Sequence, residues 1–308
     1  MAIHVFSYND PGAPPHPNAT QGTLATLLRE CLVTGYSLGD DVTSPAGWEE
    51  MFAPLNGYCA FRSLLGSRQI YQFNEAQPDP DVGYIKGCES LASVDSTPVG
   101  QWGEDYFGKR YDATNSAKWY VIADEKTCYV ILESYYGNII HGFGEFDSAI
   151  PDDPYNSFLS GHQSSDRLPS SDTSLGLHNA STPGNSRALE VHRTSIGTFA
   201  GNAALLQIGG SLSPGSSHTF SGLANTNTGL NFYTVPCFFS CDDGQENGQK
   251  LIRGKLRGIY NPLAARPIND TEIITDVATG KDLMCIYFAA DNNSSYHGCF
   301  FFDITGPW

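Results

Sequence analysis

The sequence predicts a mainly β fold, with β-sandwich or barrel-like sheets, one amphipathic helix near the N-terminus and two subdomains. Charged residues make up only 16% of the 308 residues, against about 25% in an average globular chain, while glycines number 32 and aromatic residues reach 12%. Disordered chains need high charge and few aromatic residues, so that class is excluded. Short runs of aromatic and β-branched residues bounded by turn residues are typical of strands, and they recur along this chain.

The one clear helix is predicted over residues 22–35. Apolar residues recur there at spacings of three and four, which gives a single apolar stripe, and Gly35 suits the position where a helix stops. Thr20 or Thr23 would cap its start. A short second helix is predicted over residues 46–53, because Pro45 suits a first helical turn.

Most other regular segments are predicted to be strands, because they are short and rich in aromatic and β-branched residues. They are residues 58–62, 69–73, 118–123, 128–132, 189–192, 205–208, 232–240, 282–289 and 299–304. Residues 124–126 are short enough to connect two strands as a hairpin, and residues 291–295 are the expected turn of a closing hairpin.

Three regions are predicted along the chain. Residues 1–20 form an N-terminal arm that contains four prolines, residues 21–160 form a first β-rich domain with the helix, and residues 161–308 form a second β-rich domain. The boundary is placed within 147–185, because Ser, Asp, Gly and Pro dominate there and hydrophobic periodicity is lost. Within it, residues 147–182 are predicted to be a long surface excursion.

The net charge of −16 is unevenly spread. Residues 1–160 carry 8 Lys or Arg and 21 Asp or Glu, a net charge of −13, whereas residues 161–308 carry 9 and 12, a net charge of −3. Nucleic-acid binding needs clustered Lys and Arg to neutralise phosphates, so we expect no nucleic-acid partner. No apolar run approaches the roughly 20 residues of a membrane helix, so we expect no membrane insertion. The start of the chain lacks a signal-peptide pattern, so we expect the protein to be made in a cytoplasm.

The eight cysteines are expected to be buried free thiols, because a reducing cytoplasm disfavours disulfides. Cys237 and Cys241 are the only close pair, and no histidine follows them at a distance suited to a zinc ligand. We therefore expect no metal and no cofactor.

Motifs for nucleotide binding and for hydrolase nucleophiles are incomplete in this chain. Gly142-Phe143-Gly144 lacks its third glycine, Gly280-Lys281 is followed by Asp282, and no Gly-x-Ser-x-Gly segment is present. Carboxylates on turns leave three alternatives open: solvated turns, a calcium site or a catalytic pair. Those turns are Asp79-Pro80-Asp81, Asp152-Asp153 and Asp242-Asp243-Gly244.

Aromatic runs place rings on both faces of a strand, so such a strand is sandwiched between layers or pressed against another subunit. The runs are Tyr135-Tyr136, Phe238-Phe239 and Phe300-Phe301-Phe302. Two arginines, Arg253 and Arg257, each precede a glycine and suit bidentate salt bridges with carboxylates, although exposed solubilising charges are an equal alternative. Trp308 is expected to dock in its own domain or in a neighbour's.

Several segments in order resemble a family of tailed-bacteriophage virion structural proteins. They are GTLATLLRECLVTGY (Gly22–Tyr36), PAGWEEMF (Pro45–Phe52), CAFRS (Cys59–Ser63), GYIKGCESLASVD (Gly83–Asp95), WYVIADEKTCYVIL (Trp119–Leu132), FGEFDS (Phe143–Ser148), DDPYNSFL (Asp152–Leu159), LIRGKLRGIYNPL (Leu251–Leu263) and FDITGPW (Phe302–Trp308). The chain departs from the family between Tyr36 and Pro45, where members carry a small extra domain that is missing or reduced to a loop here.

The resemblance implies a non-enzymatic structural protein of the virion, in the tail, the neck or the baseplate, whose partners are other virion proteins and copies of itself. One alternative is a receptor- or glycan-binding tail-tip protein with hydrolase activity, and a second is a head decoration protein. We expect a homo-oligomer whose interfaces lie in the nearly neutral half, since two halves at −13 would repel each other. The candidate interface residues are Arg253, Arg257, Phe238, Phe239, Phe301 and Trp308.

Overall fold

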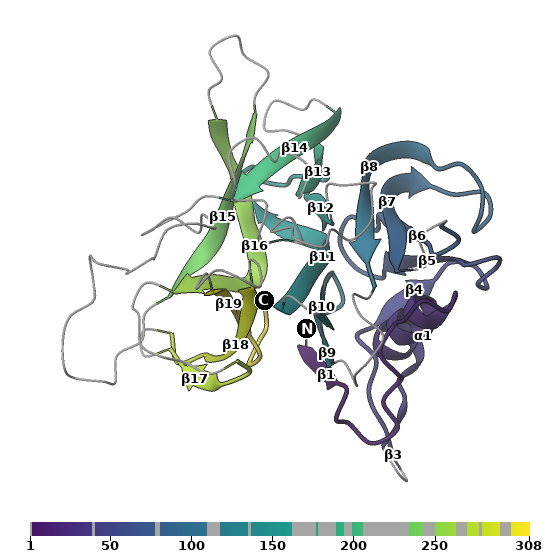
Figure 1. Ribbon diagram of the computed structural model, residues 1–308. Helices are drawn as coiled ribbons and strands as arrows, with labels where there is room; N and C mark the ends of the chain where they lie inside the picture. Colours follow the sequence, from purple (N-terminus) through teal and green to yellow (C-terminus); the bar gives the residue numbers. More distant parts are fainter. Residues whose placement is uncertain are drawn as a thin grey trace.

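The computed structural model is a mostly β protein with one short helix, which confirms the predicted fold class (Figure 1). It describes residues 2–38, 41–77, 81–109, 118–134, 137–161, 177, 189–193, 199–205, 234–242, 250–262, 270–276, 279–289 and 297–308.

The predicted helix is present, but it changes its winding halfway. Helix α1 covers Thr23–Arg29 and continues directly as a π-helix, η1, over Glu30–Thr34. The carbonyls of Cys31 and Leu32 accept hydrogen bonds from the backbone N–H groups of residues 46 and 47 (3.0 and 3.1 Å). The wider turn thus pairs two of its carbonyls with the segment that leads into strand β4.

A distant glutamate caps this helix, rather than the predicted Thr20 or Thr23. The carboxylate of Glu75 accepts hydrogen bonds from the N–H groups of Leu24 (3.3 Å) and Ala25 (3.0 Å). Lys109 Nζ lies 3.1 Å from the same carboxylate, and both side chains of this pair are fully buried. The negative charge lies at the positive end of the helix dipole, which stabilises the helix start.

The first sheet is a five-stranded antiparallel meander. Its order is β4 (Trp48–Glu50), β5 (Tyr58–Ser63), β6 (Ile70–Asn74), β7 (Val82–Ser90) and β8 (Val99–Gly108). Strand β4 occupies the segment predicted as a second helix, so that prediction was wrong. A helix of eight residues is marginal by itself, and pairing of β4 with β5 competes with it successfully. A two-stranded ribbon, β2 (Ser37–Leu38) and β3 (Asp41–Val42), precedes this sheet.

The second sheet has twelve strands. In spatial order they are β1 (His4–Ser7), β9 (Trp119–Ala123), β10 (Thr127–Ser134), β11 (Gly137–Ser148), β12 (Ser157–Ser160), β13 (Glu190–Arg193), β14 (Phe199–Leu205), β15 (Thr234–Asp242), β16 (Lys250–Pro262), β19 (His297–Asp303), β18 (Asp282–Ala289) and β17 (Ile273–Thr275).

Six of these strands form a closed ring. Strand β11 pairs with β12 over Gly142–Glu145, and its last three residues pair antiparallel with β16. The ladder β11–β12–β13–β14–β15–β16 therefore returns to β11, which is a small antiparallel barrel. Strands β10, β9 and β1 extend the sheet from the other end of β11, and β19, β18 and β17 extend it from the other end of β16 (Figure 1).

Strands β9 and β10 are buried on both faces. Residues of one parity, such as Val121 and Val130, belong to the core shared with α1 and the five-stranded sheet. Residues of the other parity, such as Ile122 and Ile131, belong to the core that also fills the barrel. One sheet thus separates two hydrophobic cores, and it joins the two halves of the chain into a continuous structure.

The predicted strands at 58–62, 69–73, 118–123, 128–132, 189–192, 282–289 and 299–304 are present with small shifts at their ends. Residues 206–208 and 232–233, the turn at 291–295 and most of the predicted excursion lie outside the described residues. The segment predicted as an excursion contains a strand, β12, that was not predicted. The predicted domain boundary at 160/161 falls between β12 and β13, which are hydrogen-bonded neighbours. The arm is not wholly irregular, because β1 pairs with β9.

In the described aromatic runs, Phe239 and all three residues of Phe300-Phe301-Phe302 are buried, whereas Phe238 is half-buried. Phe300 and Phe302 pack into the barrel-side core, whereas Phe301 packs on the opposite face with Leu283 and Cys285. Tyr135 and Tyr136 lie outside the described residues. Seven of the eight cysteines are buried, as predicted, and Cys299 is partly exposed.

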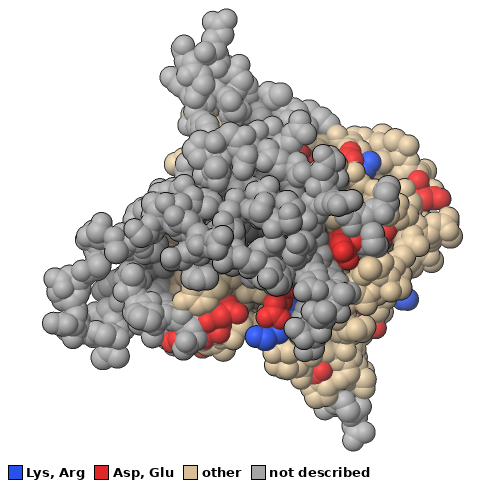
Figure 2. All heavy atoms as spheres, in the orientation of Figure 1, with Lys and Arg blue, Asp and Glu red and all other residues tan. Residues whose placement is uncertain are grey.

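Charged residues on the described surface are mostly acidic, and several pair within the chain. Figure 2 shows acidic side chains on the described part of one face, with basic side chains beside some of them. Surface pairs such as Lys86–Glu104 (3.4 Å) contribute only about 0–1 kcal/mol each. Within the described part of the chain, no helix has the length and apolar character needed to cross a membrane.

Candidate functional site

The candidate site is an open, polar groove of about 470 Å³ at one rim of the barrel. It lies where the end of β11, the following turn, β16 and the C-terminal residue meet. Its lining is mostly charged or amide side chains with one indole. The lining residues are Lys126, Glu145, Phe146, Asp147, Ser148, Ile150, Pro151, Asp152, Asp153, Asn156, Arg257 and Trp308.

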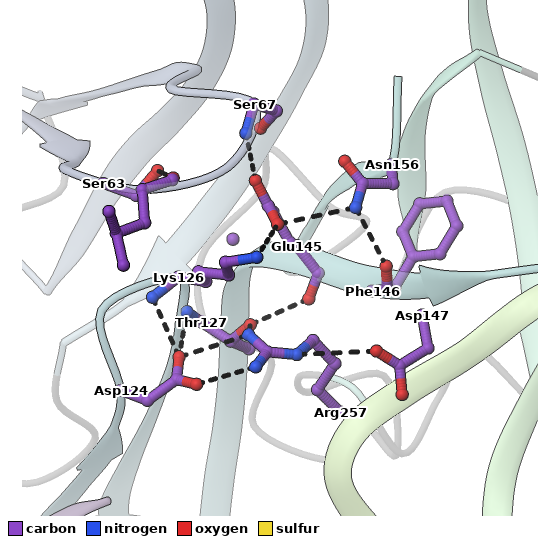
Figure 3. A network of polar contacts seen from close by, with 12 residues as sticks. Ser63, Ser67, Asp124, Lys126, Thr127, Glu145, Phe146, Asp147, Asn156 and Arg257 are labelled. Carbon is purple, nitrogen blue, oxygen red and sulfur yellow. Dashed lines mark hydrogen bonds and ion pairs between the residues drawn. The ribbon is translucent and has the colours of Figure 1, made fainter. Parts of the chain in front are cut away.

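Arg257 is the central cation of the groove (Figure 3). Its guanidinium donates two hydrogen bonds to Asp124, from Nη2 to Oδ2 (2.8 Å) and from Nη1 to Oδ1 (3.3 Å). Nη1 also donates to the hydroxyl of Thr127 (3.0 Å), and Nη2 donates to the backbone carbonyl of Trp308 (2.9 Å). Its Nε lies 3.6 Å from Asp147. One side chain therefore ties together the β9–β10 turn, β11 and the C-terminal residue.

Glu145 is the corresponding anion (Figure 3). One oxygen accepts a short hydrogen bond from the backbone N–H of Ser67, and the other lies 3.5 Å from Lys126 Nζ. Asn156 Nδ2 donates to the same carboxylate (3.5 Å). Only 3% of the Glu145 side chain is exposed. These contacts attach the loop after β5 to the barrel.

Arg253 holds the turn that follows β11. Its Nη2 lies 2.5 Å from Asp153 and donates to the carbonyl of Tyr155 (3.1 Å), and its Nη1 donates to the hydroxyl of Ser148 (2.6 Å). Its Nε donates to the carbonyl of Arg193 on β13 (2.9 Å). The guanidinium therefore connects the turn after β11 with strand β13.

Trp308 docks in its own chain. Its indole N–H donates to the carbonyl of Asp303 (2.9 Å), and its ring packs edge-on against Tyr129. A Cβ at Gly258 would lie 2.1 Å from the indole, so the ring requires a glycine there. Burial raises the pKa of the Tyr129 phenol well above its ordinary value, so its O–H remains a donor, here to the carbonyl of Arg257 (2.8 Å).

The groove's charged groups are largely engaged with one another. Asp153 pairs with Arg253, Glu145 with Lys126, and Asp147 with Lys255 (3.2 Å) and Arg257. Among the described residues, no group of three or more His, Cys, Asp or Glu side chains has the geometry to hold a metal ion. The arrangement is suited to stabilising the fold and to forming polar contacts along an open surface.

The candidate interface residues have different surroundings. Arg253, Arg257, Phe239 and Phe301 are buried within one chain, Phe238 is half-buried on β15, and Trp308 is half-buried in the groove. The two arginines form the expected carboxylate pairs, and their partners lie in the same chain. Contact of the four buried residues with a second copy would require the chain to open.

Sequence reasoning did not identify Asp124, Asp147 or Asp153 as partners of the arginines, nor the Lys126–Glu145 pair beside them. Asp124 lies in a segment predicted only as a hairpin connection, 133 residues from Arg257. The motif RGKLRG left salt-bridged and exposed arginines as equal alternatives, because only the ring closure between β11 and β16 brings the carboxylate partners to them.

A scan of the chain against models of known protein families finds no match, and a search of curated proteins also finds none.

Proposed function

We propose that this chain is a structural subunit of a tailed-bacteriophage particle, in the tail, the neck or the baseplate, and that it acts by assembling with other virion proteins and with copies of itself. The resemblance of nine segments in family order motivates the proposal. A virion subunit needs a rigid body and an exposed contact surface.

The observation that carries the proposal is a set of exposed apolar residues at the rim of the barrel, next to the polar contacts of Arg253. Ile150, Leu251 and Ile252 are 37%, 42% and 56% exposed. The backbone N–H of residue 149 donates to the carbonyl of Arg253 (2.9 Å), which places Ile150 across from Ile252, whereas Leu251 points to the other face of β16. We name Ile150 and Ile252 the rim patch.

The surroundings of the rim patch favour a contact role. Beneath it, Arg253 is 1% exposed and is fixed by four polar contacts, so the patch stands on rigid backbone. It also lies partly in the nearly neutral half of the chain, where repulsion between copies is smallest. Apolar residues gathered on a rigid surface are typical of interface cores.

Mass spectrometry of purified particles tests membership of the virion, and a cryo-EM map gives the location and copy number. Absence of the chain from particles would refute the proposal. A location on the capsid surface would favour a head decoration protein instead.

The rim patch can be tested separately with Ile252→Asp. We expect this variant to fold normally and to fail to incorporate into particles. Val99→Asp is the matched control, because Val99 is 63% exposed on the five-stranded sheet, and we expect it to incorporate. Equal incorporation of both variants would exclude the rim patch as a contact surface.

A second candidate function, receptor or glycan binding at a tail tip, is favoured by the groove itself. Its volume of about 470 Å³ falls within the range of small-ligand sites, and Asp152, Asn156 and Trp308 offer polar groups beside an aromatic ring. A glycan array probed with the purified chain tests this function, with Asn156→Ala as the variant that should lose binding. Cleavage of a bound polysaccharide would add the hydrolase activity, and no binding to any glycan would exclude this candidate.

A further inference from the structure

We propose that Cys285 and Cys299 are an oxidisable dithiol, which peroxide converts into an intrachain disulfide across the β18–β19 hairpin. This modification site is independent of the proposed assembly function. The other six cysteines are fully buried and are not part of the proposal.

Strand register places the two thiols on one face of the hairpin. Cys285 is opposite Phe301, and Cys299 is opposite Tyr287, so the cysteines are diagonal neighbours. Both belong to the same small hydrophobic cluster on the outer face of the sheet, which also contains Leu283. Diagonal neighbours have Cα atoms about 7–8 Å apart with closer Cβ atoms, so a slight tightening of the hairpin brings them within reach of a disulfide.

The two thiols have different environments. Cys285 is fully buried, and the neighbouring Cys299 thiol together with burial raises its pKa. Cys299 is the one partly exposed cysteine among the eight, all of which lie in the described part of the chain. Peroxide therefore reaches Cys299 first, and Cys285 is positioned as the resolving thiol.

The chemistry balances in two steps. The Cys299 thiolate attacks one oxygen of hydrogen peroxide, which breaks the O–O bond, releases the equivalent of one water and leaves a sulfenic acid. The Cys285 sulfur then attacks the Cys299 sulfur, forms the S–S bond and releases a second water. Two thiols lose two electrons and two protons, and one peroxide is reduced to two waters.

Peptide mapping of the full chain tests the proposal directly. The reduced protein is treated with hydrogen peroxide, alkylated without reductant and digested with trypsin. No Lys or Arg follows Lys281, so both cysteines fall in the single peptide 282–308, which contains no other cysteine. We expect this peptide to lose two hydrogens, to take up no alkylating agent, and to recover both thiols after treatment with dithiothreitol.

Two variants identify the order of the steps. Cys285→Ser is expected to accumulate a sulfenic acid on Cys299 that a dimedone probe captures, whereas Cys299→Ser is expected to keep Cys285 reduced. Full alkylation of both cysteines in the treated wild-type protein would overturn the proposal, and so would a bridge from either cysteine to another chain. The wild-type result stands by itself if either variant fails to fold.

Discussion

Replacement of Arg257 by methionine is expected to destabilise the fold by about 3–5 kcal/mol, the usual cost of removing one partner of a buried ion pair. Arg257 is 4% exposed and Asp124 is fully buried, so the change leaves a buried carboxylate without its cation. Methionine keeps most of the side-chain volume, which limits the contribution from lost packing. The remaining donors to Asp124 Oδ1 are the N–H groups of Lys126 and Thr127 (both 2.8 Å).

The assay is urea denaturation followed by circular dichroism, with the slope of the transition checked for constancy. Arg68→Ala is the matched control, because Arg68 is 52% exposed and lies 3.8 Å from Glu49, so its loss should change stability by about 0–1 kcal/mol.

A second variant separates the buried charge from the loss of packing. Asp124→Asn combined with Arg257→Met removes both charges, so it should be more stable than Arg257→Met alone. If the free energy of unfolding of Arg257→Met lies within about 1 kcal/mol of the wild-type value, Arg257 does not stabilise the fold through its buried ion pair.

Three further predictions concern other buried contacts. Lys109→Met should cost about 3–5 kcal/mol and reduce the helical signal, because it leaves the helix-capping Glu75 unpaired and buried; unchanged melting would contradict this. Burial lowers the pKa of His192 below its ordinary 6.5, so the unfolded chain binds a proton more readily than the folded one, and stability should fall as pH drops below about 6.5. His192→Gln should reduce that pH dependence when the free energy of unfolding is measured by denaturation at several pH values. Equal slopes of that free energy against pH in the variant and the wild type would show that His192 is not the group responsible. Gly258→Ala should destabilise by at least about 1–3 kcal/mol, since its Cβ would overlap Trp308 at a φ of +67°, and tryptophan fluorescence should report the displaced ring.

Local patterns in the sequence were sufficient for most elements and for the fold class. The leucine stripe of the helix and the aromatic and β-branched runs of β9 and β10 depend on neighbours within a few residues, and these elements were predicted correctly. The segment at residues 48–50 was not, because so short a segment becomes helix or strand according to what it pairs with. The same limit applies to β12, whose four residues gain their strand conformation from neighbours on either side.

The candidate site depends on long-range pairing to a greater degree. Glu75 accepts a hydrogen bond from a helix residue 51 positions earlier, and Glu145 binds a loop 78 residues away. Acidic residues are common in this chain, so composition does not single out which carboxylate meets which cation. Only the register between β11 and β16, set by three residue pairs, defines the groove.

The two arginine–glycine pairs of β16 explain why this register is stable. A Cβ added at Gly254 would lie 2.4 Å from the backbone carbonyl oxygen of Asp147. A Cβ added at Gly258 would overlap the Trp308 indole in the same manner. Each glycine lets a neighbour approach the strand, and each preceding arginine then holds that neighbour region by charge-assisted hydrogen bonds. The glycine allows the neighbouring segment to approach the strand, and the arginine forms the hydrogen bonds that hold that segment there. The contact therefore needs both residues. If this reasoning is right, Gly254→Ala and Arg253→Met should each weaken the β11–β16 seam, and the double variant should cost less than the sum of the two, because both act on one contact.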